Sequence, residues 1–437
     1  MTCPIETNMG AAAVSDESLK SAGASASIRI LPLCVVLGLA AGLAVAAIRV
    51  VAYDVMWGHI PQHVDVVGVF PVIGLLLSGL LLQFVASRPG VHDTEAYIDS
   101  AHSGVVDPPR TALAKVASAL FTVGMGGAAG LEGPSMYIGS VLGGWLRPFA
   151  VRLGARDAQA VKSLVVAGAA AGISAVFKAP LTGLIFALEV PYTDDFAKDS
   201  LVPALVASVS GYLAIVAVLG PEPLFPVNRA LAPSLSTTGL ALVLGVLLGL
   251  IARGLSLALL ASERAVERLG VSLWIRTLGG GVICGVLGVI TLRVFGSPLA
   301  LGSGYDIING SSAGLFLGWA AALLLVLRGG AVLATIGSGA AGGTFIPFMS
   351  LGAAAGGMFE GFAPGSGALF PIIGMAAFLA AANATPVAAA VFIAESTGSA
   401  GYVIPGLVAA TVAYLVSGRQ SISRNQRPSR REGRSAE

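Results

Sequence analysis

Charged residues are scarce in this sequence. Asp, Glu, Lys and Arg make up only 11% of its 437 residues, whereas hydrophobic residues make up 55%. A soluble domain carries about 25% charged residues, so this composition excludes an ordinary soluble enzyme, and we expect no nucleic-acid partner. It predicts an all-α protein that crosses the plasma or bacterial inner membrane many times.

Cysteine and histidine are also rare. Cys3, Cys34 and Cys284 have the spacing of neither a disulfide framework nor a metal site. An intramembrane serine protease would need a histidine to activate its serine. The candidate serines are Ser303 and Ser338, each in a Gly-Ser-Gly stretch, but the four histidines all precede residue 103, so none is expected beside either serine. We therefore expect no metal, no cofactor and no enzymatic activity.

Apolar segments follow one another along most of the chain. Some have about the 20 residues that a ~30 Å bilayer core requires, and these are 30–53, 66–86, 235–261, 278–295 and 313–335. Others are shorter or interrupted by glycine and proline, namely 114–129, 134–150, 161–176, 179–190, 201–219, 345–359, 368–382, 386–395 and 402–417. We interpret the shorter segments as tilted, broken or re-entrant helices, which need protein or a watery cavity around their ends.

The polar stretches divide the chain into parts. Residues 1–29 form a small, polar arm without the features of a signal peptide. A proline-rich loop, 221–234, separates a first membrane repeat (30–220) from a second (235–417). The tail, 418–437, contains six arginines, and we expect it to be solvated and disordered. By the positive-inside rule it lies in the cytoplasm, as does the arm.

The two halves contain similar sequences. The stretch "GLEGPSMYIGSVLGG" (130–144) aligns without gaps with "GTFIPFMSLGAAAGG" (343–357). In the same order, "GAAAGISAVFKAPLTGLIFALE" (168–189) aligns with "GMAAFLAAANATPVAAAVFIAE" (374–395), and a glycine, a proline and a glutamate keep their spacing. Two weakly similar halves with interrupted helices are typical of an inverted-repeat transporter, whose site lies where the broken helices meet.

The first pair of stretches has the sequence features of helix N-termini, because a glycine precedes a proline in the first turn. A helix N-terminus carries about half a positive charge and free N–H groups, so it attracts anions. Two such ends that meet inside a membrane would bind an anion without the tight hold of a lysine or arginine. The repeat therefore predicts an anion pathway.

Glu132 lies within the first of these stretches, where a buried carboxylate is costly. An ionised Glu132 would occupy the position of the anion, and a protonated or displaced Glu132 would admit one. We therefore interpret Glu132 as a gate. The alternative is a glutamate that only caps the helix, but Phe345 stands at the equivalent position of the second repeat, so the fold does not require an acid there.

At these residues the sequence resembles the CLC family of chloride channels and proton-coupled chloride antiporters, as a divergent member without the regulatory domain pair. The family pattern G-[KR]-E-G-P is present as "GLEGP", G-x-F-x-P as "GTFIP", and "GSGYDII" (302–308) also resembles a family segment. The resemblance covers residues 30–417 and implies a CLC-type inverted repeat that assembles as a homodimer with one pore per subunit.

The resemblance also implies roles for particular residues. Glu132 would be the gating glutamate of a chloride pathway. Backbone N–H groups of further residues would bind the anion, and these are Leu131, Gly133, Thr344, Phe345 and Ile346. Two family hydroxyls are missing in our alignment, because Pro89 and Ala400 stand where a serine and a tyrosine would face the central anion.

The acid that passes protons on the inner side in many antiporters of the family is missing as well. Val190 takes its place, directly after Glu189. Glu189 itself is interpreted either as a structural acid at a helix end, as its repeat partner Glu395 suggests, or as part of a proton path. We therefore expect chloride transport that is channel-like or weakly coupled to protons. Proton-coupled chloride antiport is the alternative, and fluoride export ranks third.

Overall fold

The computed structural model describes residues 28–61, 63–64, 66–87, 92–227, 234–268, 270–362, 368–418, 421–423 and 425–429. Within these ranges the protein is almost entirely helical, without any named strand. The first half contains α2 (Leu31–Arg49), η1 (Val50–Met56), η2 (Trp57–His59), α3 (Val69–Phe84), α4 (Asp93–Ser103), α5 (Pro109–Gly124), α6 (Glu132–Trp145), α7 (Arg147–Arg152), α8 (Ala158–Phe177), α9 (Pro180–Glu189), η3 (Lys198–Ser200) and α10 (Leu201–Leu219).

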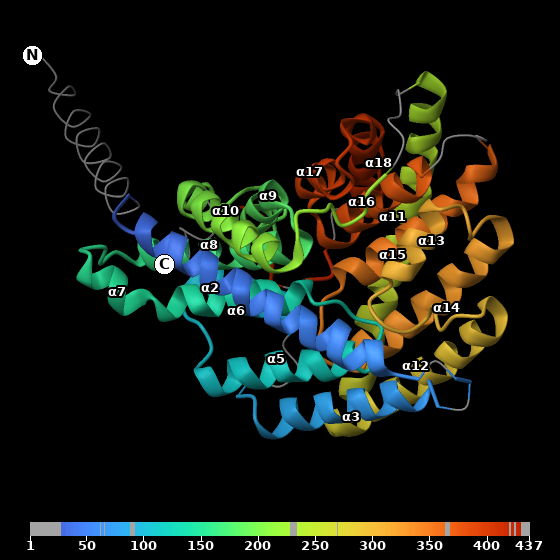
Figure 1. Ribbon diagram of the computed structural model, residues 1–437, viewed down its shortest axis with the longest axis horizontal. Helices are drawn as coiled ribbons and strands as arrows, with labels where there is room; N and C mark the ends of the chain where they lie inside the picture. Colours follow the sequence, from blue (N-terminus) through green and yellow to red (C-terminus); the bar gives the residue numbers. More distant parts are fainter. Residues whose placement is uncertain are drawn as a thin grey trace, which may run out of the picture.

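The second half repeats this order. It contains α11 (Leu235–Arg268), α12 (Leu273–Phe295), α13 (Tyr305–Ser312), α14 (Gly318–Gly337), α15 (Phe345–Phe359), η4 (Glu360–Phe362), α16 (Leu369–Asn383), α17 (Pro386–Thr397), η5 (Ala400–Tyr402) and α18 (Val403–Val416). In Figure 1 the blue-to-green half occupies the left, and the orange-to-red half occupies the upper right. The equivalent helices α3 and α12 pack against each other at the bottom.

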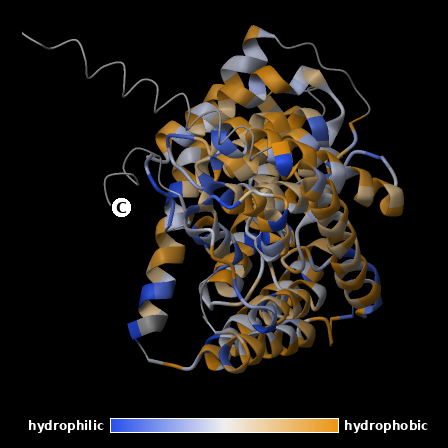
Figure 2. Ribbon diagram, turned by 90° about the vertical axis from the view of Figure 1, so that its left-hand side faces the viewer, coloured by the Kyte–Doolittle hydropathy of each residue, from blue (hydrophilic) through white to orange (hydrophobic). Residues whose placement is uncertain are grey.

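The apolar helices form a long and a short class, but three of them were predicted wrongly. The segment 66–86 was expected to be long and yields the short α3, whereas 161–176 and 201–219 were expected to be short and yield α8 and α10, which are long enough to cross a membrane. Six described helical segments are long and apolar enough to cross a membrane, whereas α3, α9, α15, α16, α17 and the η5–α18 segment are shorter. The long helix α8 is enclosed by protein, with 94% of its most apolar window buried. By contrast, α2, α10, α11 and α12 expose leucine, isoleucine and valine side chains, and orange hydrophobic residues cover much of the outer helices in Figure 2. A central layer of short and buried helices therefore sits inside lipid-facing ones.

Paired glycines bring the central helices into contact at equivalent places. Gly139 of α6 lies against the carbonyl of Gly168 on α8, and Gly352 of α15 lies against the carbonyl of Gly374 on α16. A β-carbon at any of these four positions would collide with the facing backbone. Glycine therefore permits the close helix approach that membrane proteins achieve with small residues.

Backbone strain follows the same symmetry. Among the described residues, only Lys178 (φ 51°) and Ala384 (φ 56°) are non-glycine residues with positive φ. They terminate α8 and α16, each two residues before the proline that begins the next helix. An alignment of Gly168 with Gly374 places Lys178 opposite Ala384, so the sequence repeat is also a repeat of backbone conformation.

The described part of the C-terminal tail is not solvated as we expected. Arg427 donates its backbone N–H to Pro191 O at 3.1 Å and accepts from the N–H of Thr193 at 3.0 Å. Ile422 donates to Ala382 O at 3.0 Å and packs against the main hydrophobic core. This part of the tail therefore docks on the ends of α9 and α16. Its backbone hydrogen bonds hold it there although its side chains are mostly polar. The arm 1–27 lies outside the described residues.

Candidate functional site

The N-termini of α6 and α15 meet inside the protein, as the repeat predicted. Gly130 and Gly343, each two residues before its helix, exchange two backbone hydrogen bonds of 2.7 Å, N–H of one to C=O of the other. They form an isolated antiparallel bridge between the halves of the chain. The bridge therefore fixes the first turns of α6 and α15 next to each other.

Glu132, the first residue of α6, lies at this junction and is fully buried. Its carboxylate lies beside Gly130 and Gly343, and a β-carbon at Gly343 would be 2.8 Å from Oε2. The backbone N–H groups of Leu131, Ile346 and Glu132 itself lie close to the carboxylate, but among the described residues neither oxygen has a partner with hydrogen-bond geometry. A buried carboxylate in this state is costly, and such sites are commonly functional.

The other predicted anion-binding residues surround Glu132. Leu131, Phe345 and Ile346 are buried, and Thr344 precedes the first turn of α15. Gly133 lies against Gly343, whose Cα would be 3.2 Å from a β-carbon at position 133. The structure therefore gathers all six predicted residues at one junction. Their N–H groups belong to helix first turns, which lack intrahelical partners and attract negative charge.

Glu189 has a capping role that it shares with Glu395. Its two carboxylate oxygens accept the N–H groups of Val387 (3.2 Å) and Ala388 (2.8 Å) in the first turn of α17. Glu395 in turn accepts the N–H groups of Leu181 (2.9 Å) and Thr182 (2.6 Å) in the first turn of α9. The two acids thus cap each other's helix, a geometry that supports the structural interpretation of Glu189.

The two positions of the missing hydroxyls have different outcomes. Pro89 lies outside the described residues. Ala400 is exposed and lies in the turn η5, and the nearby Tyr402 interacts electrostatically with Glu360 after α15. Since the 15 residues of α15 span about 22 Å from the junction, our expectation that position 400 faces the central anion was wrong. The alignment placed Ala400 relative to the start of α18, and that helix does not begin at the junction.

A buried polar cluster at the start of α4 was missed in the sequence. Asp93 lies next to Gly133, and its buried Oδ2 has no hydrogen-bond partner among the residues that the structure describes. Lys115 of α5, also buried, forms an ion pair with Asp107 (3.5 Å) and lies over the ring of Tyr137. The Tyr137 hydroxyl donates to Asp107 at 2.8 Å. A lysine within an apolar segment was the available signal, because buried charges are paired.

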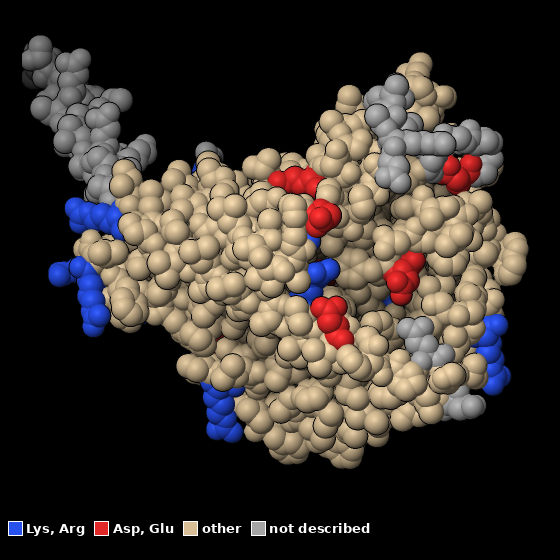
Figure 3. All heavy atoms as spheres, in the orientation of Figure 1, with Lys and Arg blue, Asp and Glu red and all other residues tan. Residues whose placement is uncertain are grey.

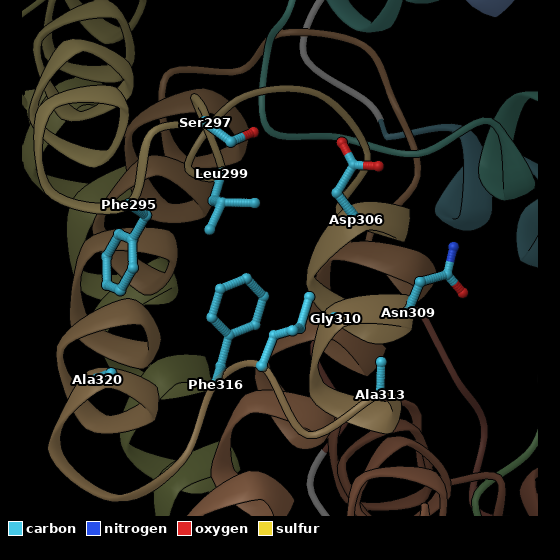
Figure 4. Close-up of a pocket in the computed structure, with 10 residues that line it drawn as sticks. Phe295, Ser297, Leu299, Asp306, Asn309, Gly310, Ala313, Phe316 and Ala320 are labelled. Atoms are coloured by element: carbon cyan, nitrogen blue, oxygen red, sulfur yellow. The ribbon is translucent and has the colours of Figure 1, made fainter.

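A separate pocket of about 690 Å³ lies between α12, α13 and the start of α14. Figure 4 shows Asp306 and Asn309 of α13 on one side and Phe295, Leu299 and Phe316 on the other. None of the predicted anion-binding residues lines it. Its apolar lining and its carboxylate do not suit an anion, so we do not assign the pathway to this pocket. Among the described residues, no cluster of three His, Cys, Asp or Glu side chains could hold a metal.

Solved structures share this fold. A slow cyanobacterial Cl⁻/H⁺ antiporter superposes with a TM-score of 0.77 at 21% identity, over 90% of this chain and 96% of that one. A CLC-type fluoride/proton antiporter gives a TM-score of 0.76 at 21% identity over the same shares. At such identity the likeness concerns the fold alone.

Sequence relatives lead to the family. A putative chloride channel protein, ClcB-like, from Ralstonia nicotianae is 30% identical over 79% of this chain and 81% of its own length. The H⁺/Cl⁻ exchange transporter ClcA of Salmonella paratyphi A is 29% identical, and the match spans 68% of this chain and 63% of that protein. Residues 73–418 match the family described as voltage gated chloride channel. This chain therefore belongs to the voltage-gated chloride channel (CLC) family.

Proposed function

We propose that the protein transports chloride across the membrane through the junction of α6 and α15, with Glu132 as the gate. The single observation that carries this proposal is the buried Glu132 carboxylate without a hydrogen-bond partner, set among the N–H groups of two helix first turns. These N–H groups would bind an anion once Glu132 is protonated or displaced. Backbone dipoles are weak enough to release the anion again.

The distribution of positive charge supports an orientation in the membrane. Arg29, before α2, donates to Gly154 O at 3.5 Å beside α7, and α7 contains Arg147 and Arg152. The start of α2 and α7 lie on the left of Figure 1. Figure 3 shows basic side chains at that edge, with others at the bottom and right edges and acidic side chains nearer the centre of the face. By the positive-inside rule we place this side, with both termini, in the cytoplasm.

Weak or absent proton coupling is the mechanism that we favour. Val190 cannot transfer a proton, and its carbonyl accepts a hydrogen bond from Gln426 Nε2 at 2.8 Å. Glu189 beside it is occupied with the N–H groups of α17. Of the described residues at the inner end of α9, Glu189 is thus engaged by α17 and Val190 carries no acid for a route to Glu132.

Proton-coupled chloride antiport is the second candidate. The names of the ClcA relatives favour it, because they are H⁺/Cl⁻ exchangers. A fluoride-exporting function has less support, because the similarity to the fluoride/proton antiporter concerns the fold alone. We also propose a homodimer, as the family resemblance implies. The contacting helices α9 and α17 leave Leu181 (50%) and Val387 (43%) exposed, and crosslinking in liposomes would test the contact.

A flux measurement in liposomes tests the proposal. Protein reconstituted with a chloride gradient, and with the membrane potential clamped by valinomycin and potassium, should release chloride while the internal pH hardly changes. Sustained uphill proton movement that disappears in Glu132→Gln would establish antiport instead. A folded protein that moves neither chloride nor protons would contradict both candidates.

A further inference from the structure

Two tyrosine hydroxyls near Glu132 have no hydrogen-bond partner in the part of the chain that the structure describes. Tyr53 and Tyr305 belong to different halves of the chain, and their rings pack edge to face with centroids 5.8 Å apart. Both hydroxyl oxygens are buried and unpartnered. Both phenols interact electrostatically with Glu132. Buried hydroxyls normally have a partner, so an unpaired couple beside a gate requires an explanation.

A local change of helix type positions Tyr53. The helix α2 continues into the π-helical segment η1, which contains Tyr53. A π-helical turn in an α-helix is rare and frequently marks a functional site. The segment is fixed by the ring of Trp57, which lies against Gly126 and Gly302. Tyr53 therefore reaches the loop before α13 because of this irregular turn.

A buried arginine positions Tyr305. Arg328 donates hydrogen bonds to the carbonyl oxygens of Ala300 (2.9 Å), Leu301 (3.2 Å), Gly302 (2.8 Å) and Ser303 (2.5 Å). This loop then turns at Gly304 (φ 103°) into Tyr305, the first residue of α13. The guanidinium thus fixes the loop that presents the phenol. Ser303 is a polar neighbour of the Tyr53 hydroxyl, without hydrogen-bond geometry between them.

Positive charge lies on the same side. Arg49, at the end of α2, interacts electrostatically with both phenols. It also interacts with Lys178, whose Nζ donates to Leu219 O at 2.9 Å. Tyr53 follows Leu31 by 22 residues, which is about 33 Å along a helix. It therefore lies near the face opposite the basic one, which the proposed orientation makes the outer face.

We propose that Tyr53 and Tyr305 form an outer binding site for a small monovalent anion, such as chloride, next to Glu132. This inference rests on the proposed function. Each phenol would donate its O–H to the anion, while Arg49 attracts the anion from solution without binding it directly. Two neutral hydroxyls stabilise an anion by hydrogen bonds but bind it less tightly than a lysine or arginine side chain would, so the anion can leave again. The anion would wait here until Glu132 leaves the junction.

The phenols could instead serve Glu132 itself, as partners for its carboxylate after it swings out. The two roles differ when the carboxylate is absent. In a Glu132→Ala background, hydroxyls that bind the anion still contribute to its affinity, whereas hydroxyls that only hold the carboxylate contribute nothing.

Isothermal titration calorimetry of the purified protein with chloride and with bromide tests the proposed anion site directly. Tyr53→Phe and Tyr305→Phe should each weaken anion affinity about tenfold in the Glu132→Ala background, since each removes one hydrogen bond to a charged acceptor. Tyr212→Phe on α10 is the matched control and should change nothing. A bromide peak between the two phenols in an anomalous diffraction map should vanish in the double variant.

Several results would overturn the site. One is an unchanged anion affinity in both Tyr53→Phe and Tyr305→Phe, and another is an equal loss of affinity in Tyr212→Phe. The third is a loss of affinity in the first two variants that occurs only in proteins that retain Glu132. These results would leave the proposed function intact if wild-type liposomes still release chloride. Conversely, normal Tyr-dependent binding in a protein that releases no chloride would keep the site and refute the function.

Discussion

Gly130 and Gly343 each donate a 2.7 Å hydrogen bond to the other, and this pair of bonds joins the two halves of the chain beside Glu132. The two bonds fix the N-termini of α6 and α15 together. A shift of one helix end should therefore displace the other. The proposed gate would therefore depend on the contact between the repeats and not on the first repeat alone.

The first prediction follows from this contact. A β-carbon at Gly343 would lie 2.7 Å from the nitrogen of Gly133 and 2.8 Å from Oε2 of Glu132. Gly343→Ala should therefore destabilise the protein by about 1–3 kcal/mol through overpacking and reduce chloride flux. Gly279→Ala on α12 is the control, because beyond the neighbouring backbone of its own helix no described atom lies within 4 Å of the added carbon. Thermal unfolding and liposome efflux measure the two effects, and equal behaviour of the variants would contradict the tight junction.

The second prediction concerns the gate. Glu132→Gln removes the charge and Glu132→Ala removes the side chain that occupies the junction. If the Glu132 carboxylate competes with the anion, as we propose, chloride efflux should persist in both variants but lose its dependence on pH. Efflux from liposomes between pH 4.5 and 8 measures this. Loss of all chloride flux in a correctly folded Glu132→Ala protein would show that the residue is not a gate.

The junction could be predicted because it depends on local residues. A glycine followed four residues later by a proline is typical of a helix start. This pair occurs in both halves, as Gly130 with Pro134 and as Gly343 with Pro347. The helix starts at Glu132 and Phe345 follow from them. The repeat then implied that the two ends meet, and the contact between Gly130 and Gly343 confirms it.

The features that were missed depend on contacts between distant segments. No short pattern indicates that Arg328 gathers the carbonyls of residues 300–303, or that η1 turns Tyr53 toward Tyr305. The expected place of Ala400 depended on an alignment along one helix, and an alignment of this kind does not indicate where that helix lies. Composition misled us about the tail, because backbone hydrogen bonds such as those of Arg427 do not depend on side-chain polarity.

The third prediction separates the two interpretations of Glu189. Each of Glu189 and Glu395 caps a helix with two hydrogen bonds to backbone N–H groups. Glu189→Gln and Glu395→Gln should therefore destabilise the protein by similar amounts, about 0.5–2 kcal/mol each, and leave chloride flux in place. Thermal unfolding in detergent gives the first quantity. If Glu189→Gln alone abolished a proton movement seen in the wild type, with Glu395→Gln as the unaffected control, the proton-path interpretation would prevail.

The fourth prediction concerns His102, which joins α4 to the docked tail. It lies at the end of α4, outside the candidate membrane spans. Its Nε2 lies 3.1 Å from Pro191 O, and its ring packs edge to face on Tyr192. Burial lowers the pKa of His102 to about 4, and the charge of Arg427 on the tail contributes in the same direction. His102 is therefore neutral at physiological pH while the tail is docked.

Docking of the tail should accordingly weaken in acid. Release of the tail removes the Arg427 charge and so raises the pKa of His102 from about 4 toward the free value of about 6.5. The released state therefore binds more protons than the docked state within this range. The stabilisation by His102 is thus complete above pH 6.5 and is lost as the pH falls toward 4. A spin label at Ser429→Cys, in a Cys3→Ser background, should be immobile at pH 7.5 and mobile at pH 4.5. His102→Gln removes the titrating group, so its label should keep one mobility at both pH values, and an unchanged pH response in this variant would assign the transition to another group.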